Sequence, residues 1–84
     1  MNAILEVLFN GNVTMAATLT NTDFTEWPGV YTIHADSGFN LTIYKKDLIN
    51  YVSDEKTDVF TLQVQGCPIT IKLEWDCVEG DETA

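Results

Sequence analysis

Apolar and polar residues alternate along most of the chain, most regularly over residues 58–76, where two alternating runs flank Gly66-Cys67-Pro68. A two-residue period on both sides of a glycine-proline turn is typical of a β-hairpin. With residues 65–68 as its loop, the apolar residues of both runs share one face, as burial requires. The predicted pairs are Val64 with Ile69, Leu62 with Ile71, and Phe60 with Leu73.

A second hairpin is predicted at the start of the chain, where alternating runs over residues 3–9 and 13–19 flank Asn10-Gly11-Asn12. A two-residue loop would place Phe9 opposite Asn12. A three-residue loop brings the apolar residues together instead, so we expect that loop, with Gly11 or Asn12 in the left-handed region. It pairs Phe9 with Val13, Val7 with Met15, and Leu5 with Ala17.

A third hairpin is predicted from residues 30–34 and 39–44, which residues 35–38 connect. The segment before it, residues 20–29, reads as a polar connection that ends in the turn-forming sequence Trp27-Pro28-Gly29. We expect Trp27 to cap one end of the core, because a domain this small needs its aromatic residues. The alternative is that Trp27 stands exposed as an anchor for a partner.

Helical spacing occurs over residues 45–53, where Leu48, Tyr51 and Val52 stand at positions i, i+3 and i+4. We expect one short helix near residues 46–53, held by packing on the sheet. The fold class is therefore mainly β, with about six antiparallel strands in three hairpins that form a small barrel or sandwich. Residues 1–77 are predicted to form one domain, and residues 78–84 an acidic, mobile tail.

The charge balance is unusual, because thirteen acidic residues oppose four lysines, arginine is absent and the net charge is −9. Proteins bind nucleic acid largely through Lys and Arg that neutralise phosphates, so direct nucleic-acid binding is not expected. A basic protein surface is the expected partner, although the charge could serve solubility alone. The hairpin register brings two acidic segments together at one end. The candidate partner-binding residues are Asp54, Glu55, Asp58, Glu74, Asp76, Glu79 and Trp27.

Catalytic and metal-binding patterns are not found. His34, Asp36 and Ser37 fall in one predicted turn, where Asp and Ser are expected for backbone reasons, so they do not indicate a catalytic triad. On an extended strand, Cys67 and Cys77 lie about 30 Å apart, whereas a disulfide needs Cα atoms within about 7 Å. Two free thiols fit a reducing, cytoplasmic compartment. We expect no enzymatic activity, no cofactor, no metal site and no membrane span, since no apolar run reaches ~18 residues.

The expected function is that of a small acidic protein-binding module. In its narrower form, the module is a phage-encoded stoichiometric inhibitor that presents acidic residues to a host nucleic-acid-processing or defence protein. Mimicry of DNA would need Asp54, Glu55 and Asp58 or a dimer, because charges along the tail are spaced about 6 Å apart against ~1.7 Å along duplex DNA. Two alternatives are an assembly protein that forms a homodimer or larger array through strand edges, and a ligand-binding barrel whose mouth is lined by Trp, Tyr and His34.

Overall fold

The computed structural model describes residues 1–76 and contains strands in antiparallel pairs with one short 3-10 turn. The predicted tail, together with Cys77 and Glu79, lies outside the described residues. In chain order the elements are β1 (Asn2–Phe9), β2 (Asn12–Leu19), β3 (Asp23–Trp27), β4 (Val30–His34), β5 (Asn40–Tyr44), η1 (Lys45–Asp47), β6 (Leu48–Ser53), β7 (Thr57–Val64) and β8 (Cys67–Asp76).

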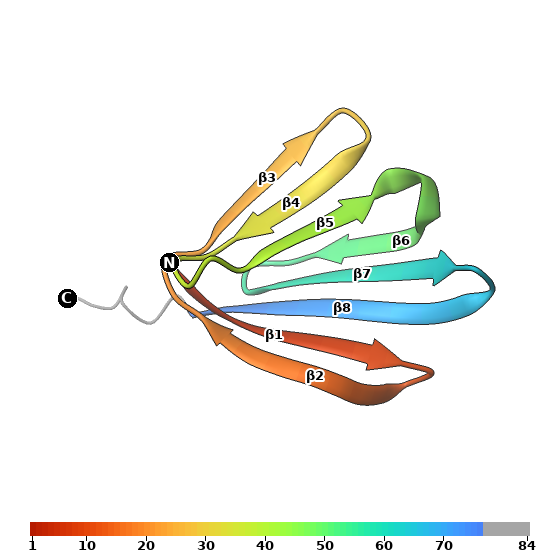
Figure 1. Cartoon of the computed structure of the whole chain (residues 1–84), viewed down its shortest axis with the longest axis horizontal. Coiled ribbons are helices and arrows are strands. Elements are labelled where there is room, and N and C mark those ends of the chain that lie inside the picture. The colour runs from red at the N-terminus through yellow and green to blue at the C-terminus, as the bar shows by residue number, and fades with distance from the viewer. Residues whose placement is uncertain (77–84) are drawn as a thin grey trace.

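The strands form two separate sheets and do not close into a barrel (Figure 1). One sheet has five strands in the order β2-β1-β8-β7-β6, and the other has three in the order β3-β4-β5. In Figure 1 the strands spread from the end of the molecule that carries the N-terminus. The mainly antiparallel fold class is therefore confirmed, with more strands than the sequence pattern predicts.

The core lies between the two sheets, because each strand turns alternate residues to the inner face. Leu5, Phe60 and Leu73 from the five-stranded sheet and Ile33 and Ile43 from the three-stranded sheet are fully buried. Aromatic contacts join the layers: the Tyr31 ring lies 5.3 Å from the Phe60 ring. Burial on both inner faces fixes which side chains of each strand point inward.

The β7–β8 hairpin differs from its predicted register by two residues. Gln65 and Gly66 alone form the loop, and both have positive φ, 52° and 80°, as a two-residue hairpin turn requires. Val64 therefore pairs with Cys67 and Phe60 with Ile71. The predicted pairs are wrong, but the predicted buried face is right, because a shift of two residues matches the side-chain period.

The β1–β2 hairpin also has a two-residue loop, with Asn10 and Gly11 at positive φ and Phe9 paired with Asn12. The predicted three-residue loop is wrong. An irregularity of the bulge type between Val7 and Leu8 shifts the register by one residue. Beyond it the predicted pairs, Val7 with Met15 and Leu5 with Ala17, are confirmed.

The predicted helix over residues 46–53 is not formed, and η1 and β6 occupy this segment. A register shift between Leu48 and Asn50 sets Leu48 opposite Leu62 and Tyr51 opposite Phe60. Leu48 and Tyr51 therefore share the inner face although they are three residues apart. A bulged strand thus reproduces the spacing of one helical turn. Pairing with β7 also satisfies backbone groups that the two ends of a short helix would leave unpaired.

Residues 20–29 were predicted as a connection, but Asp23–Trp27 form β3, which pairs with β4. Trp27 is 53% exposed, so the prediction that it caps the core is wrong. The turn at Pro28-Gly29 is confirmed, with Gly29 at φ 87°. The third hairpin is confirmed as well, and it pairs Tyr31 with Ile43 and Ile33 with Leu41.

Candidate functional site

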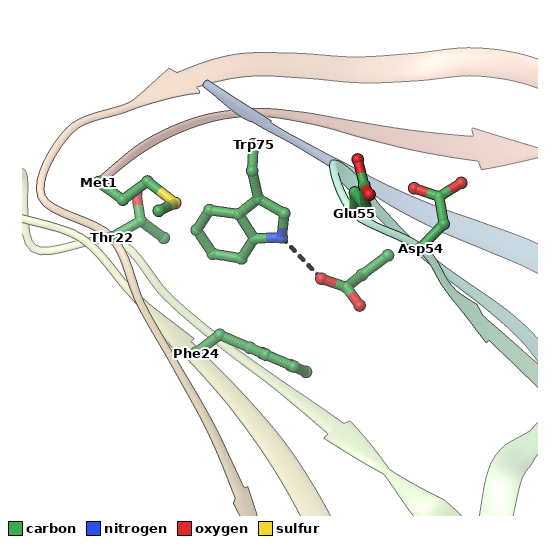
Figure 2. Close-up of a pocket in the computed structure, with 7 residues that line it drawn as sticks. Met1, Thr22, Phe24, Asp54, Glu55 and Trp75 are labelled. Atoms are coloured by element: carbon green, nitrogen blue, oxygen red, sulfur yellow. Dashed lines mark hydrogen bonds between the residues drawn. The ribbon is translucent and has the colours of Figure 1, made fainter. Parts of the chain in front are cut away.

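A pocket of about 380 Å³ lies at the end of the molecule where the β6–β7 turn, the start of β3, the end of β8 and the N-terminal residue meet (Figure 2). We call it the acidic-end pocket. Figure 2 shows the Trp75 ring between two groups of lining residues, with Met1 and Thr22 on one side of the ring and Asp54 and Glu55 on the other. Its lining residues are Met1, Thr22, Phe24, Asp54, Glu55, Asp58 and Trp75.

Asp58 is a buried carboxylate in the pocket wall, with only 6% of its surface exposed. The Tyr51 hydroxyl donates a hydrogen bond to Asp58 Oδ1 at 2.6 Å, and Trp75 Nε1 donates one to Oδ2 at 2.6 Å. Both donors are neutral groups, and no lysine or histidine within residues 1–76 forms an ion pair with Asp58. The carboxylate is thus held in place by directed hydrogen bonds, and its position in the wall leaves it able to attract a cation.

Tyr51 keeps its proton over the physiological range. Burial, and then the hydrogen bond to Asp58, raises the pKa of Tyr51 to about 12. Desolvation disfavours the phenolate, and the neighbouring carboxylate would repel it. Tyr51 therefore acts as a hydrogen-bond donor to Asp58 and not as a titrating group.

Asp54 has a different role from Asp58, because it organises the exposed turn between β6 and β7. Its Oδ1 accepts hydrogen bonds from the amides of Lys56 and Thr57, both at 3.0 Å, and from the Thr57 hydroxyl at 2.9 Å. These bonds, the Lys56 amide first, lower the pKa of Asp54 below its ordinary value. The adjacent Glu55 is exposed. The turn therefore presents two carboxylates at the rim of the pocket.

The aromatic part of the pocket is fixed by packing. Phe24 stacks on Tyr31 with ring centroids 5.6 Å apart and an interplanar angle of 9°, and the Trp75 ring lies 6.5 Å from Phe24. The Trp75 amide also donates to the Lys56 carbonyl at 2.7 Å, which ties the end of β8 to the β6–β7 turn. Trp75 is thus held through both its backbone and its indole nitrogen.

Thr22 lines the same pocket and carries an unusual hydroxyl. The residue is 6% exposed, and its Oγ1 forms no hydrogen bond with any described residue. Its amide, in contrast, donates to the Met1 carbonyl at 2.7 Å. A buried hydroxyl without a partner is uncommon in folded proteins and calls for a physical reason.

The predicted acidic residues are brought together in part. Asp54, Glu55 and Asp58 line the acidic-end pocket. Glu74 and Asp76 lie beside Trp75 on β8, with Glu74 paired with Thr57 and Asp76 with Asn2, and they line neighbouring hollows.

Two predicted site residues do not join this set. Trp27 lies at the far end of β3, where its Nε1 donates to the Thr32 hydroxyl at 3.1 Å. Glu79 lies outside the described residues.

Sequence reasoning missed Thr22 and Phe24, because both belong to the segment predicted as a connection. Phe24 carried a usable signal: it is the one apolar residue among polar neighbours in Asp23-Phe24-Thr25, a pattern typical of an edge strand. Thr22 carried none, since an isolated threonine is common in any polar segment. Its burial depends on contacts between distant parts of the chain.

Other candidate chemistry is not assembled. The His34 ring nitrogen Nδ1 lies 2.8 Å from Asn40 Oδ1, and Asp36 accepts a hydrogen bond from the Asn21 side chain, so the two do not form a triad with Ser37. Cys67 is a free thiol. Over residues 1–76 no group of three or more His, Cys, Asp or Glu side chains is arranged to hold a metal ion. The same residues include no helix long and apolar enough to cross a membrane.

Comparison with known proteins finds no matching family model, no matching curated sequence and no matching solved structure. The function is therefore inferred from the geometry of the acidic-end pocket and the residues around it.

Proposed function

We propose that this protein is a small binding module that engages a basic surface of another protein through the acidic-end pocket and its rim. One observation carries the proposal: Asp54, Glu55 and Asp58 converge on one pocket beside an aromatic ring, in a chain with a net charge of −9. Like charges at close range destabilise a fold unless other interactions offset the repulsion. Here backbone amides hold Asp54 and neutral donors hold Asp58.

This arrangement would raise the rate at which a partner with clustered lysines or arginines associates, and it would favour that partner over others. A surface of one sign steers an oppositely charged partner during encounter and makes association sensitive to salt. The ring of Trp75 adds an apolar surface of the type that anchors binding interfaces. The negative charge attracts the partner from a distance, and the pocket then provides the surface that the bound partner contacts.

The narrower form of the proposal is a stoichiometric, phage-encoded inhibitor that occupies the basic groove of a host nucleic-acid-processing or defence protein in the cytoplasm. The free thiol of Cys67 is compatible with such a reducing compartment. Occupation of the groove by a rigid acidic end would block the natural ligand by competition. Mimicry of DNA is a special case of this proposal. It needs more charges than the C-terminal acidic residues supply, because their spacing of about 6 Å is wider than the ~1.7 Å between charges along duplex DNA.

A second candidate function is assembly through strand edges. The outer edge of β6 exposes Ile49 and Val52, and an exposed apolar edge strand can pair with another copy. Sedimentation equilibrium distinguishes this alternative, since it predicts a dimer or larger species, whereas the binding module acts as a monomer toward its partner.

The test of the main proposal is the affinity for a lysine-rich peptide at low and high salt, measured by fluorescence anisotropy. Glu55→Lys is the informative variant because Glu55 is exposed at the rim, whereas Asp58→Lys would bury an unpaired ammonium. We expect about thirtyfold weaker binding at low salt, because the charge reversal replaces an attraction of about 1 kcal/mol by a repulsion of similar size, a total change of about 2 kcal/mol.

Glu26→Lys is the matched control, because it changes the net charge equally on the distal part of β3. Glu26 forms a surface ion pair with Lys45 at 2.6 Å, and the loss of such a pair changes stability little. Equal weakening by both variants would show that net charge alone acts, and the acidic end would lose its assigned role.

A further inference from the structure

We propose that the outer face of the three-stranded sheet binds a neutral oligosaccharide. The buried residues Tyr31, Ile33 and Ile43 define the inner face of this sheet, and the side chains that alternate with them point outward. None of these outward residues lines the acidic-end pocket, so the inference goes beyond the proposed function. Strand pairing sets the outward residues in three rows across β3, β4 and β5, and we call this face the platform. Its rows are Trp27, Val30 and Tyr44, then Thr25, Thr32 and Thr42, then Asp23, His34 and Asn40.

The first row carries two exposed aromatic side chains. Trp27 is 53% exposed and Tyr44 is 52% exposed. Trp27 Nε1 donates a hydrogen bond to the Thr32 hydroxyl on the neighbouring strand at 3.1 Å, so the indole extends over the sheet toward β4. A ring that is already held in place loses less conformational entropy when a ligand stacks on it. The platform therefore presents a preorganised aromatic surface to solvent.

The spacing of the two aromatic residues fits more than one sugar unit. Trp27 stands on β3 and Tyr44 on β5, with Val30 of β4 between them. Two strand spacings separate the Cα atoms of Trp27 and Tyr44 by about 9–10 Å. This length exceeds one hexose ring and is close to that of two consecutive rings in an extended chain. The first row therefore matches an oligosaccharide, whereas a monosaccharide would contact one aromatic ring only.

The second and third rows supply the polar groups that a sugar needs. The face of a hexose ring consists of C–H groups, which are attracted to the negatively charged face of an aromatic ring. The sugar hydroxyls lie around the rim of the ring, and each of them donates and accepts hydrogen bonds. Thr25 and Thr42 are exposed, and threonine hydroxyls likewise donate and accept. His34 Nδ1 lies 2.8 Å from Asn40 Oδ1, which orders these two side chains in the third row.

The charge of the platform disfavours other ligands that stack on aromatic rings. Nucleic-acid bases stack on such rings, but those sites add basic residues that bind the phosphates, and the platform contains no lysine. Lys46 stands at its rim, 5.8 Å from the centroid of the Tyr44 ring, with a side chain that is 78% exposed. Anionic glycans would be repelled by the net charge of −9. The core of a protein interface is mainly apolar, whereas two of the three rows are polar. A neutral glycan matches all of these properties.

The experiment titrates ¹⁵N-labelled protein with four neutral hexasaccharides and follows the indole N–H signals of Trp27 and Trp75 by NMR. The probes are cellohexaose, mannohexaose, xylohexaose and maltohexaose. We expect a saturable shift of the Trp27 signal with at least one of them, and no shift of the Trp75 signal, which serves as an internal control in the acidic-end pocket. The corresponding monosaccharide should bind about tenfold or more weakly, because it reaches only one ring. An oligogalacturonate and an oligothymidylate should not bind.

Substitutions on the platform test the role of each ring. Trp27 and Tyr44 are both more than half exposed, so the fold tolerates their loss. Trp27→Ala and Tyr44→Ala should each weaken the hexasaccharide about tenfold or more, and Tyr44→Phe, which keeps the ring, should weaken it less. Thr32→Val removes the acceptor that positions the indole. It should shift the Trp27 signal of the free protein and weaken binding about two- to tenfold. Ile49→Ala, on an exposed apolar residue of β6, is the control and should change nothing.

The outcomes separate this proposal from the proposed function. Glu55→Lys should leave hexasaccharide binding unchanged, and Trp27→Ala should leave binding of the lysine-rich peptide unchanged. If no hexasaccharide shifts the Trp27 signal, or if Trp27→Ala binds as tightly as the wild type, the platform proposal is overturned and the acidic-end proposal stands. Binding of oligothymidylate at Trp27 would overturn it in favour of nucleic-acid bases. A Trp27 signal that shifts when the protein alone is diluted would overturn it in favour of a second copy of the chain.

Discussion

The hydrogen bonds around Asp58 give the sharpest prediction for stability. Asp58→Ala removes an acceptor that is 6% exposed and leaves the Tyr51 hydroxyl and the Trp75 indole N–H without a partner. A hydrogen bond to a charged group contributes about 1.5–3 kcal/mol, so two of them set an upper limit near 6. Tyr51 and Trp75 are only partly buried, and water can replace part of the loss. We expect the free energy of unfolding to fall by about 2–4 kcal/mol.

Urea denaturation followed by tryptophan fluorescence measures this change. Tyr51→Phe is the matched variant, because it removes one donor to Asp58 and keeps the ring stacked on Phe60 at 4.7 Å. A double-mutant cycle of the two substitutions should give a coupling free energy of about 1 kcal/mol or more. A loss below about 0.5 kcal/mol for Asp58→Ala, the range of ordinary surface substitutions, would refute the placement of Asp58 in the wall.

Three further predictions follow from neighbouring residues. Thr22→Val should leave stability unchanged or raise it by up to about 1–2 kcal/mol in thermal or urea unfolding, because it removes a buried hydroxyl without a partner. Phe60→Ala should cost about 3–5 kcal/mol in the same assay, since Phe60 is fully buried at the centre of the core. Asp54, whose pKa is lowered in the fold, contributes stability that is present above its ordinary value of 3.8 and is lost as the pH falls through the lower folded value. Asp54→Ala should therefore flatten the acid limb of a stability-against-pH curve measured by circular dichroism.

Much of the fold could be predicted, because strand alternation survives errors in register. Phe60, Leu62 and Leu73 were placed on the buried face although the β7–β8 loop was assigned two residues too long. A shift of two residues keeps each side chain on its own face, whereas loop length depends on the positive φ of Gln65. Asn, Asp and Gly favour a positive φ, whereas Gln rarely adopts it, so the sequence does not predict a two-residue loop at Gln65.

Two segments could not be assigned from pattern alone. The spacing of Leu48 and Tyr51 fits both one helical turn and a strand with a bulge, and pairing with β7 decides in favour of the strand. Trp27 was placed in the core on the general need of small domains for aromatic residues. In the structure Phe24, Tyr31, Tyr51 and Phe60 fill that role, and Trp27 is left exposed.

The candidate site was predicted at its acidic side only. The convergence of acidic segments at one end of the hairpin follows from strand pairing, which sequence alternation reveals. Asp58, however, was treated as a surface charge, although it stands in phase with Phe60 and Leu62 on the inner face. Thr22 directly precedes β3, the first strand of the three-stranded sheet, and only the packing of the two sheets brings it to the pocket.

The central claim, that the acidic end is the binding surface, is tested most directly by mapping amide shifts across the chain as a lysine-rich peptide is added to ¹⁵N-labelled protein. We predict the largest shifts at residues 22–24, 54–58 and 74–76, which lie in or beside the pocket. The loops at Asn10-Gly11 and Gln65-Gly66, which join the opposite ends of the β1–β2 and β7–β8 strands, should shift little. Shifts concentrated on β6 around Ile49 and Val52, or at those loops, would contradict the account.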